Sequence, residues 1–349
     1  MEEPIVSNDT LVAVDLAKVE FDVVVSTQVG KVDKGRRVKR AAFMELMAQH
    51  PQATVIMEAC GSAHELGRKL HKLGHKVVLL PPHAVRPYVT RNKTDRADAK
   101  ALLEAYRNQD IRPVPVKSVE QQTLMSMHRL RSGWIGDRTA KINTIRGLLR
   151  EFGLFIPVGA NKVLAHAHEY IADPDSGLPA ALRSLLTQMC DDIRTLDERV
   201  AGVTDQITAL GRQTPIVSRL LTVPGIAYII ATALVACVGD IHRFPSARHF
   251  ASYLGLTPKE YSSGSKRRLG RISKKGDVYL RMLLIHGARS ILAHAHKAKH
   301  PDRLQGWALR LEQKLGANKA AVALANKIAR IAWAVWKHDR DFESKPLAA

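Results

Sequence analysis

Residues 179–212 carry the pattern that most constrains how this chain can fold. Large apolar side chains recur there in alternating steps of four and three residues, which places them along one side of a helix. The positions are Leu182, Leu186, Met189, Ile193, Leu196, Val200, Val203, Ile207 and Leu210. A seam this regular predicts a long helix that packs against another helix as in a coiled coil. Its partner is either the helix expected at residues 119–152 of the same chain or another subunit of an oligomer.

The segments around the seam differ in kind. Residues 119–152 combine apolar residues at helical intervals with many Arg and Lys, and residues 153–175, which contain Pro157, Gly159 and Pro174, predict a break. Residues 221–238 have the cadence of a helix-hairpin-helix, with Gly225 at the turn. Backbone N–H groups at such a turn can face a DNA phosphate, although a plain helix turn has the same pattern. Further helices are expected at 243–256, 278–292, 307–314 and 319–336.

The N-terminal part alternates between strand and helix patterns. Short apolar, β-branched runs predict strands at 11–15, 21–26, 35–40, 53–57 and 76–80, and helices are expected at 41–49 and 62–73. This order predicts an α/β sheet of mixed direction with both faces covered. The fold class expected for the whole chain is therefore α/β plus all-α, with a long helical middle and a mainly helical C-terminal part.

Four acids in this region form a candidate metal site. Asp15 and Glu58 end predicted strands, at the edge of an α/β sheet where ligands gather. Asp95 and Asp98 are three residues apart, so a helix that starts there presents both on one face. Carboxylates held this close repel one another unless a cation lies between them, and oxygen ligands favour Mg²⁺ or Mn²⁺. Each acid alone is equally consistent with a solvated strand end or helix start.

Composition points to a polyanionic partner. The 349 residues carry a formal charge of +20 and a pI near 10.1, which is typical of proteins that bind nucleic acid. No apolar run is long enough to span a bilayer, so no membrane partner is expected. Cys60, Cys190 and Cys237 lack the spacing of a zinc site and predict a reducing, cytoplasmic environment.

A basic stretch at residues 257–276 is rich in Gly and Ser and is expected to be a flexible loop that contacts nucleic-acid phosphates. The cations expected to bind nucleic acid are Lys266, Arg267, Arg268, Arg271, Lys274 and Lys275. Ser263 is an exposed hydroxyl among these cations, which can stabilise an alkoxide and a phosphate. Taken alone, most serines in basic loops are solvated linkers.

Together these stretches resemble a known family. LVAVDLAKVEFDVVV, VIMEACGS and NKTDRADAKAL are similar to the three acidic blocks of the DEDD transposases of bacterial insertion sequences, relatives of the Piv and MooV DNA invertases. VPGIAYIIATAL and the stretch from GDIHRFPS to SSGSKRRLGRISKKGDVYLR resemble the C-terminal domain of that family. The similarity covers nearly the whole chain in the same order.

The resemblance implies a RuvC-like (RNase H-like) catalytic domain at 1–113, a helical coiled-coil oligomerisation region at 114–213 and a C-terminal transposase domain at 214–340. It implies that Asp15, Glu58, Asp95 and Asp98 bind Mg²⁺ (or Mn²⁺) and that Ser263 is the nucleophile, with Ser262 as the alternative. The implied partners are donor and target DNA, a structured noncoding bridge RNA as guide, and further copies of the chain in a dimer or tetramer. The implied location is the bacterial cytoplasm, in association with the nucleoid.

Two other hypotheses stay open. A RuvC-like Holliday-junction resolvase or nuclease would use metal-activated water and no serine. A nucleic-acid-binding assembly protein without catalysis would use its acids only structurally.

Overall fold

The computed structural model describes residues 10–27, 35–89 and 97–344, together with the backbone but not the side chains of Asp95 and Arg96. The chain divides into two compact units, Met1–Glu120 and Gln121–Ala349, which are described in turn. The three domains expected from the sequence, with boundaries near residues 113 and 213, stay a prediction.

The first unit is built on a mixed sheet. Among the described residues its strands are β1 (Leu11–Leu16), β2 (Glu20–Ser26), β3 (Arg36–Lys39), β4 (Thr54–Glu58) and β5 (Lys76–Leu80). The strand order is β3-β2-β1-β4-β5. β2 runs antiparallel to β1 and β3, whereas β1, β4 and β5 are parallel to one another. The strands and the mixed α/β class predicted from the sequence are confirmed.

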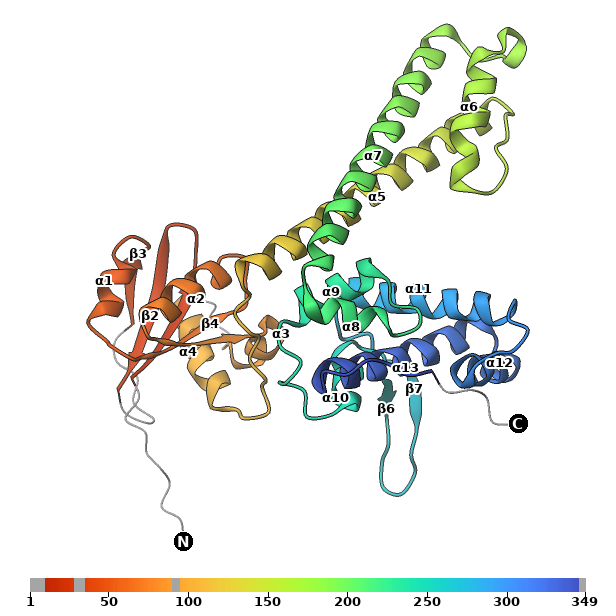
Figure 1. Cartoon of the computed structure of the whole chain (residues 1–349). Coiled ribbons are helices and arrows are strands. Elements are labelled where there is room, and N and C mark those ends of the chain that lie inside the picture. The colour runs from red at the N-terminus through yellow and green to blue at the C-terminus, as the bar shows by residue number, and fades with distance from the viewer. Residues whose placement is uncertain (1–9, 28–34, 90–94, 345–349) are drawn as a thin grey trace. The chain divides into compact units, whose positions relative to one another are not determined.

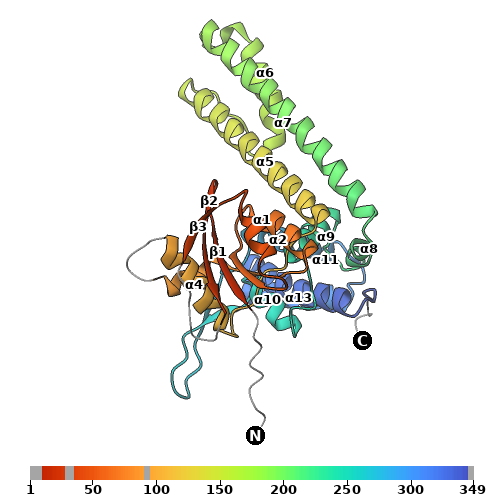
Figure 2. The same ribbon diagram turned by 90° about the vertical axis from the view of Figure 1, so that its left-hand side faces the viewer.

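Helices cover both faces of this sheet, as Figures 1 and 2 show. The helical elements of the unit are α1 (Phe43–Ala48), α2 (Ala63–Lys72), α3 (Pro82–Val85), the 3₁₀ turn η1 (Arg86–Tyr88) and α4 (Asp95–Arg107). One face packs on α1 and α2 through residues such as Val14, Val23 and Met57. The opposite face packs on α4 through Ala13 and Ile56, among others. Because side chains alternate along a strand, this division decides which acids lie under α4.

The second unit contains a long helical hairpin and a helical bundle (Figure 1). Its helices are α5 (Val119–Glu151), α6 (Val163–Ala172), α7 (Ala180–Arg212), α8 (Pro215–Leu221), α9 (Tyr228–Val238), α10 (Ala247–Tyr253), α11 (Val278–Ala295), α12 (Arg303–Leu315) and α13 (Ala317–Lys337). A two-stranded ribbon, β6 (Pro258–Glu260) and β7 (Leu269–Ile272), lies between α10 and α11. In the described part of the chain, no helix is both long and apolar enough to cross a bilayer.

The heptad seam of α7 is buried within the chain. Leu186 and Ile193 pack against Ile145 and Leu149 of α5, and Ile207 packs against Leu124 near the other end of the hairpin. Two basic side chains of α5 also stabilise this pairing, since Arg138 and Lys141 pair with acids of α7 at 2.6 and 2.7 Å. The intramolecular partner expected as one alternative is therefore the one observed. This packing occupies the apolar face that an intermolecular coiled coil would need.

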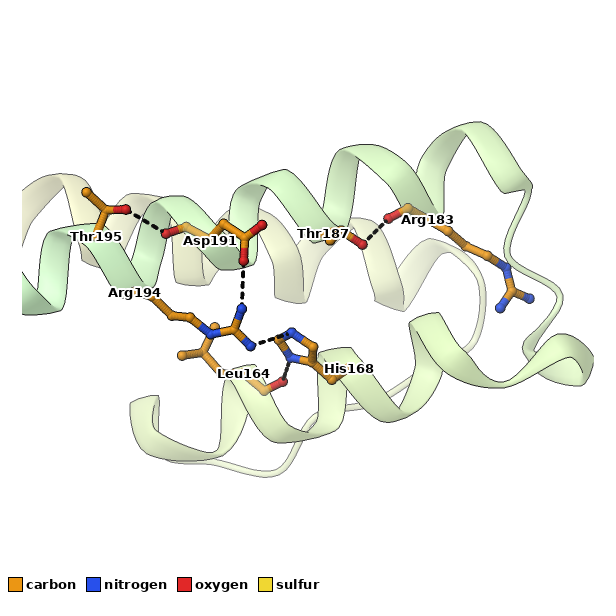
Figure 3. A network of polar contacts seen from close by, with 7 residues as sticks. All are labelled: Leu164, His168, Arg183, Thr187, Asp191, Arg194 and Thr195. Atoms are coloured by element: carbon orange, nitrogen blue, oxygen red, sulfur yellow. Dashed lines mark hydrogen bonds and ion pairs between the residues drawn. The ribbon is translucent and has the colours of Figure 1, made fainter.

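The predicted break at residues 153–175 is wrong in part, because α6 forms inside it. Val163 and Ala167 of α6 are fully buried against α7. In the network of Figure 3, Arg194 of α7 contacts Asp191 and also His168 of α6, whose other ring nitrogen bonds to the Leu164 carbonyl. Pro and Gly residues at both ends hid a short helix that tertiary packing stabilises.

Candidate functional site

Two of the predicted acids lie side by side on the face of the sheet that α4 covers. Asp15 follows Val14 on β1, and Glu58 follows Met57 on β4, at positions where Val14 and Met57 are paired in the parallel register. Both acids are half-buried at the carboxyl ends of their strands. They share a face with Ala13 and Ile56, whose side chains pack against α4.

Asp98 of α4 lines the same pocket as these two acids. The pocket has a volume of about 700 Å³, and its walls include Asp15, Glu58, Asp98, His83 and Arg86. The three acids come from β1, β4 and α4, so the fold gathers them from distant parts of the sequence. Asp95 is the first residue of α4, but its side chain lies outside the described residues.

The donor chemistry of this pocket fits a hard divalent cation, because all three acidic side chains offer carboxylate oxygens. Within the described side chains, however, no three acidic, His or Cys groups come close enough together to hold one ion. The pocket thus brings three of the predicted acids together, but not as closely as the ligands of one bound ion. The side chain of Asp95 lies outside the described residues and is not one of these three.

Asp22 is an acid at this site that the sequence reasoning missed. It is the direct cross-strand partner of Asp15 in the antiparallel β1–β2 register, so both side chains are on the same face. Arg37, its partner on β3, donates a hydrogen bond from Nε to Asp22 Oδ2 at 3.3 Å. The alternation of residues along the predicted strands 11–15 and 21–26 contained this signal, since the two acids flank the turn symmetrically.

His83 and Arg86 were also missed, although both follow β5 at the carboxyl edge of the sheet. They are exposed and bring cationic or hydrogen-bonding groups to the wall of an acidic pocket. The same edge rule that selected Asp15 and Glu58 applies to the residues that follow a neighbouring parallel strand. An acidic floor with basic groups at the wall suits a phosphate ester that is held together with a cation.

The basic stretch at 257–276 is a β-hairpin and not the flexible loop expected from its Gly and Ser content. At its tip Ser263 and Lys266 exchange backbone hydrogen bonds of 3.4 and 3.2 Å around Gly264, which has a φ of 55°. A glycine with positive φ at the first central position is typical of a tight type II′ turn, which suits the twist of a hairpin.

The six predicted cations of the hairpin are all exposed. Arg267 pairs with Glu260 at 3.3 Å. The other five, Lys266, Arg268, Arg271, Lys274 and Lys275, have no acidic partner within ion-pair distance among the described residues. The hairpin therefore presents an uncompensated positive charge.

The two candidate serines differ in their hydrogen bonding. The Ser262 hydroxyl donates to Glu260 Oε1 at 2.7 Å and accepts from the Arg268 N–H at 3.1 Å. This hydrogen bond from Ser262, followed by the charge of Arg267, lowers the pKa of Glu260 below its usual value. In the described part of the chain the Ser263 hydroxyl has no such partner, and it lies at the turn itself.

The base of the hairpin is held rigidly. Arg281 is buried and donates hydrogen bonds to the carbonyls of Leu254 and Gly276, each at 3.2 Å. A Cβ at Gly276 would lie 2.1 Å from the Tyr253 carbonyl oxygen, so only glycine allows this approach. Close packing thus anchors the ends of both strands in the bundle.

The helix-hairpin-helix-like turn joins α8 to α9, as the sequence predicted. Gly225 has a φ of 77°, and a Cβ there would lie 2.8 Å from the Gly287 carbonyl oxygen of α11. Packing between the turn and α11 accounts for this glycine without a phosphate contact.

Comparison with known proteins agrees with these observations. Residues 12–153 match a transposase family of the DEDD type found in IS110 elements, and residues 217–304 match the transposase IS116/IS110/IS902 family. A probable family 20 transposase of Pseudomonas aeruginosa is 44% identical over 94% of this chain and 97% of its own length. The transposase for insertion sequence element IS1111A of Coxiella burnetii is 38% identical over 93% of this chain and 89% of its own.

A more distant relative is the pilin gene-inverting protein of Moraxella bovis, 26% identical over 96% of this chain and 98% of its own. The two family matches follow one another along the chain in the order that the sequence resemblance implied. The relatives from Pseudomonas aeruginosa and Coxiella burnetii match almost the full length of the chain. The chain therefore belongs to the IS110/IS116 family of DEDD transposases, enzymes that cleave and rejoin DNA.

Proposed function

We propose that this chain is the transposase of an insertion sequence and recombines DNA through a divalent-metal site and a serine nucleophile. Asp15, Glu58, Asp95 and Asp98 would hold Mg²⁺ or Mn²⁺ in a RuvC-like first unit. The observation that carries the proposal is the pocket lined by Asp15, Glu58 and Asp98, three acids from separate elements on one face of a mixed sheet.

The bound cations would supply electrophilic stabilisation of charge on the phosphate oxygens. The protein side chains have distinct tasks around that phosphate. The strands fix Asp15 and Glu58, α4 sets Asp98 against them, and Arg86 and His83 approach from the wall. Asp22 lies opposite Asp15 on the neighbouring strand and accepts a hydrogen bond from Arg37.

Ser263 is the proposed nucleophile because its hydroxyl lies at the hairpin turn among exposed cations. Its Oγ would form an ester bond to phosphorus as the bond to one DNA strand end breaks, and the serine proton would pass to the departing strand-end oxygen, so the number of phosphate ester bonds is unchanged. The second strand end can then displace the serine, so rejoining needs no external energy source. The hydrogen bonds of Ser262 within the hairpin favour Ser263 over its neighbour for this role.

Guidance by a structured bridge RNA, which the family resemblance implies, is part of the proposal, and the composition of the chain is consistent with it. If base pairing reads the sequence, the protein needs mainly contacts to nucleic-acid backbones, which Lys and Arg provide. A charge of +20 with an aromatic content of 5% fits that division of labour. The proposed assembly is a dimer or tetramer in the bacterial cytoplasm, in association with the nucleoid. Because α5 buries the α7 seam within one chain, the contacts between subunits would use other surfaces.

The test is trapping of a covalent protein–DNA adduct by the full-length protein with matched donor and target DNA and its co-purified RNA. The proposal expects an adduct on a peptide that contains Ser263, formed only with Mg²⁺ or Mn²⁺. Metal-dependent cleavage without an adduct would favour a resolvase that uses water. Binding without any cleavage or strand transfer would favour an assembly protein.

A further inference from the structure

Four cationic side chains gather on the last two helices, away from the hairpin cations in the sequence. Arg303 and Arg310 are two turns apart on α12, and Lys327 and Arg330 are three residues apart on α13. Such spacings place each pair on one helix face. The three arginines are exposed and Lys327 is half-buried. We call these four residues the α12–α13 cation cluster.

The charges of this cluster are uncompensated. Among the described residues none of its four members has an acidic side chain within ion-pair distance. Burial, followed by the charges of Arg303, Arg330 and Arg310, lowers the pKa of Lys327 below its usual value. All three arginines therefore lie close enough to repel the lysine ammonium.

An aromatic ring holds the lysine in this unfavourable position. The Lys327 ammonium lies 3.9 Å from the centroid of the Trp307 ring, which is on α12 one turn from Arg303 and about one from Arg310. A cation–π contact of this kind fixes the ammonium on the ring face. The cation–π contact thus holds the Lys327 ammonium in place among the three arginines, so the like charges of the cluster are brought together by the fold.

Three basic residues of the helical hairpin show the opposite arrangement. Arg138 and Lys141 pair with acids of α7, and Arg146 donates hydrogen bonds to the carbonyls of Ile156, Pro157 and Gly159. Those cations stabilise the fold and are not available to a ligand in the same way. In the part of the chain that the structure describes, the four cations of the α12–α13 cation cluster make no comparable ion pair or carbonyl hydrogen bond.

We propose that the α12–α13 cation cluster binds the phosphate backbone of a nucleic acid, as a contact surface additional to the β6–β7 hairpin. Anionic phosphates between the four cations remove their mutual repulsion, and guanidinium groups match phosphate oxygens in a bidentate geometry. Lys327 covers the Trp307 ring on one face, so the site is suited to backbone contact more than to stacking of a base. The inference goes beyond the proposed function, which places nucleic-acid contacts at the acidic pocket and the hairpin but none on α12 or α13.

The test compares two triple variants of the full-length protein. Arg303→Gln/Arg310→Gln/Arg330→Gln removes the exposed cations of the cluster. The control Lys69→Gln/Arg107→Gln/Lys141→Gln removes the same number of charges from positions that already pair with acids at 2.6 to 2.8 Å. Affinities for duplex DNA and duplex RNA of random sequence are measured over a salt series.

The cluster variant is expected to bind at least one duplex roughly 10- to 100-fold more weakly at moderate salt. The slope of log affinity against log salt should fall by about 0.9 for each DNA phosphate that the variant no longer neutralises. The control should keep the slope of the unmodified protein. Loss of affinity for RNA alone would assign the cluster to an RNA backbone, and loss for DNA alone to a DNA backbone. Unchanged slopes and affinities on both duplexes would overturn the proposal.

A single substitution supplies a second readout. Lys327→Met keeps an apolar stem over Trp307 but removes the repelled charge, so it should raise the melting temperature while it lowers the salt slope. Lys327→Arg should retain the slope. Failure of the serine or carboxylate roles would change strand exchange and leave these salt slopes as they are, so the two sets of results are distinguishable. If Lys327→Met and the triple variant both leave the slope unchanged, the cluster has no part in binding.

Discussion

The Ser262 hydroxyl donates a hydrogen bond of 2.7 Å to Glu260 in the hairpin that presents Ser263. Glu260 also pairs with Arg267, and the Ser262 oxygen accepts from the Arg268 N–H. Ser262 thus links the two sides of the hairpin just before the turn. The two adjacent serines therefore differ in their hydrogen bonding, since the Ser263 hydroxyl has no such partner among the described residues.

Substitution of each serine should separate these roles. We expect Ser263→Ala to reduce strand exchange by at least roughly 10³-fold, because it removes the proposed nucleophile, while nucleic-acid affinity stays within about twofold. Ser262→Ala should retain measurable strand exchange, since the turn and its cations persist. Product formation and adduct trapping on matched DNA are the measurements. Loss of activity in Ser262→Ala with normal activity in Ser263→Ala would reverse the assignment.

Removal of one carboxylate from the pocket should impair metal binding. We expect Asp98→Asn to lower strand exchange on the order of 10²- to 10³-fold, because it removes one charged oxygen ligand from the proposed metal site. Titration of Mn²⁺, followed by water proton relaxation, should show weaker binding. The control is Asp110→Asn, an exposed acid after α4 that does not line the pocket. Equal Mn²⁺ affinity in the two variants would contradict the metal role of Asp98.

The sequence predicted the elements of this fold well wherever the residue pattern itself determines them. The strands 76–80 and 53–57 and the seam helix at 179–212 depend on local periodicity and chain breaks, and each is found with nearly the expected ends. The helix α6 and the hairpin β6–β7 were missed for the opposite reason. Packing of Val163 and Ala167 on α7 stabilises α6, and the anchors at Gly276 and Arg281 order the hairpin.

The candidate site was predictable in part for the same reason. Asp15 and Glu58 follow from the rule about the carboxyl ends of strands, and Asp98 follows from helix spacing. Asp22, in contrast, lies beside the site through its register opposite Asp15, so finding it required pairing the two predicted strands and not reading either alone. The α12–α13 cation cluster depends on how two helices pack and on which cations lack an acid nearby. Contacts of this kind, between separate strands or helices, cannot be predicted from the residue pattern of one segment alone.

His128 should make the stability of the second unit depend on pH. It is buried between Tyr279 and Thr232, with hydrogen bonds of 3.0 Å to both, and burial followed by the charge of Arg131 lowers its pKa to about 4. Because the unfolded side chain titrates near 6.5, the unfolded state takes up the proton first as the pH falls. The stabilisation is therefore complete above the pKa of the unfolded state, and it is lost as the pH falls from about 6.5 to about 4.

Across this pH range the free energy of unfolding is expected to fall by about 3 kcal/mol at most, because the pKa of His128 differs by roughly 2.5 between the folded and unfolded states. Thermal melts over that range should show it, and His128→Gln should flatten the profile. His300→Gln, at an exposed position, should leave the profile unchanged. If the His128→Gln profile matched that of the unmodified protein, another group would be responsible for the pH dependence.

Two glycines within helices should respond in opposite directions to the same substitution. A Cβ at Gly287 of α11 would lie 2.2 Å from the Gly225 carbonyl oxygen, whereas a Cβ at Gly202 of α7 meets nothing within 4 Å. Gly287→Ala should therefore destabilise the bundle by about 1–3 kcal/mol or more, because the turn between α8 and α9 must move. Gly202→Ala should stabilise α7 by up to about 1 kcal/mol through helix propensity alone. Denaturant midpoints of the two variants measure the difference, and a stabilising Gly287→Ala would show that the turn does not pack on α11 as described.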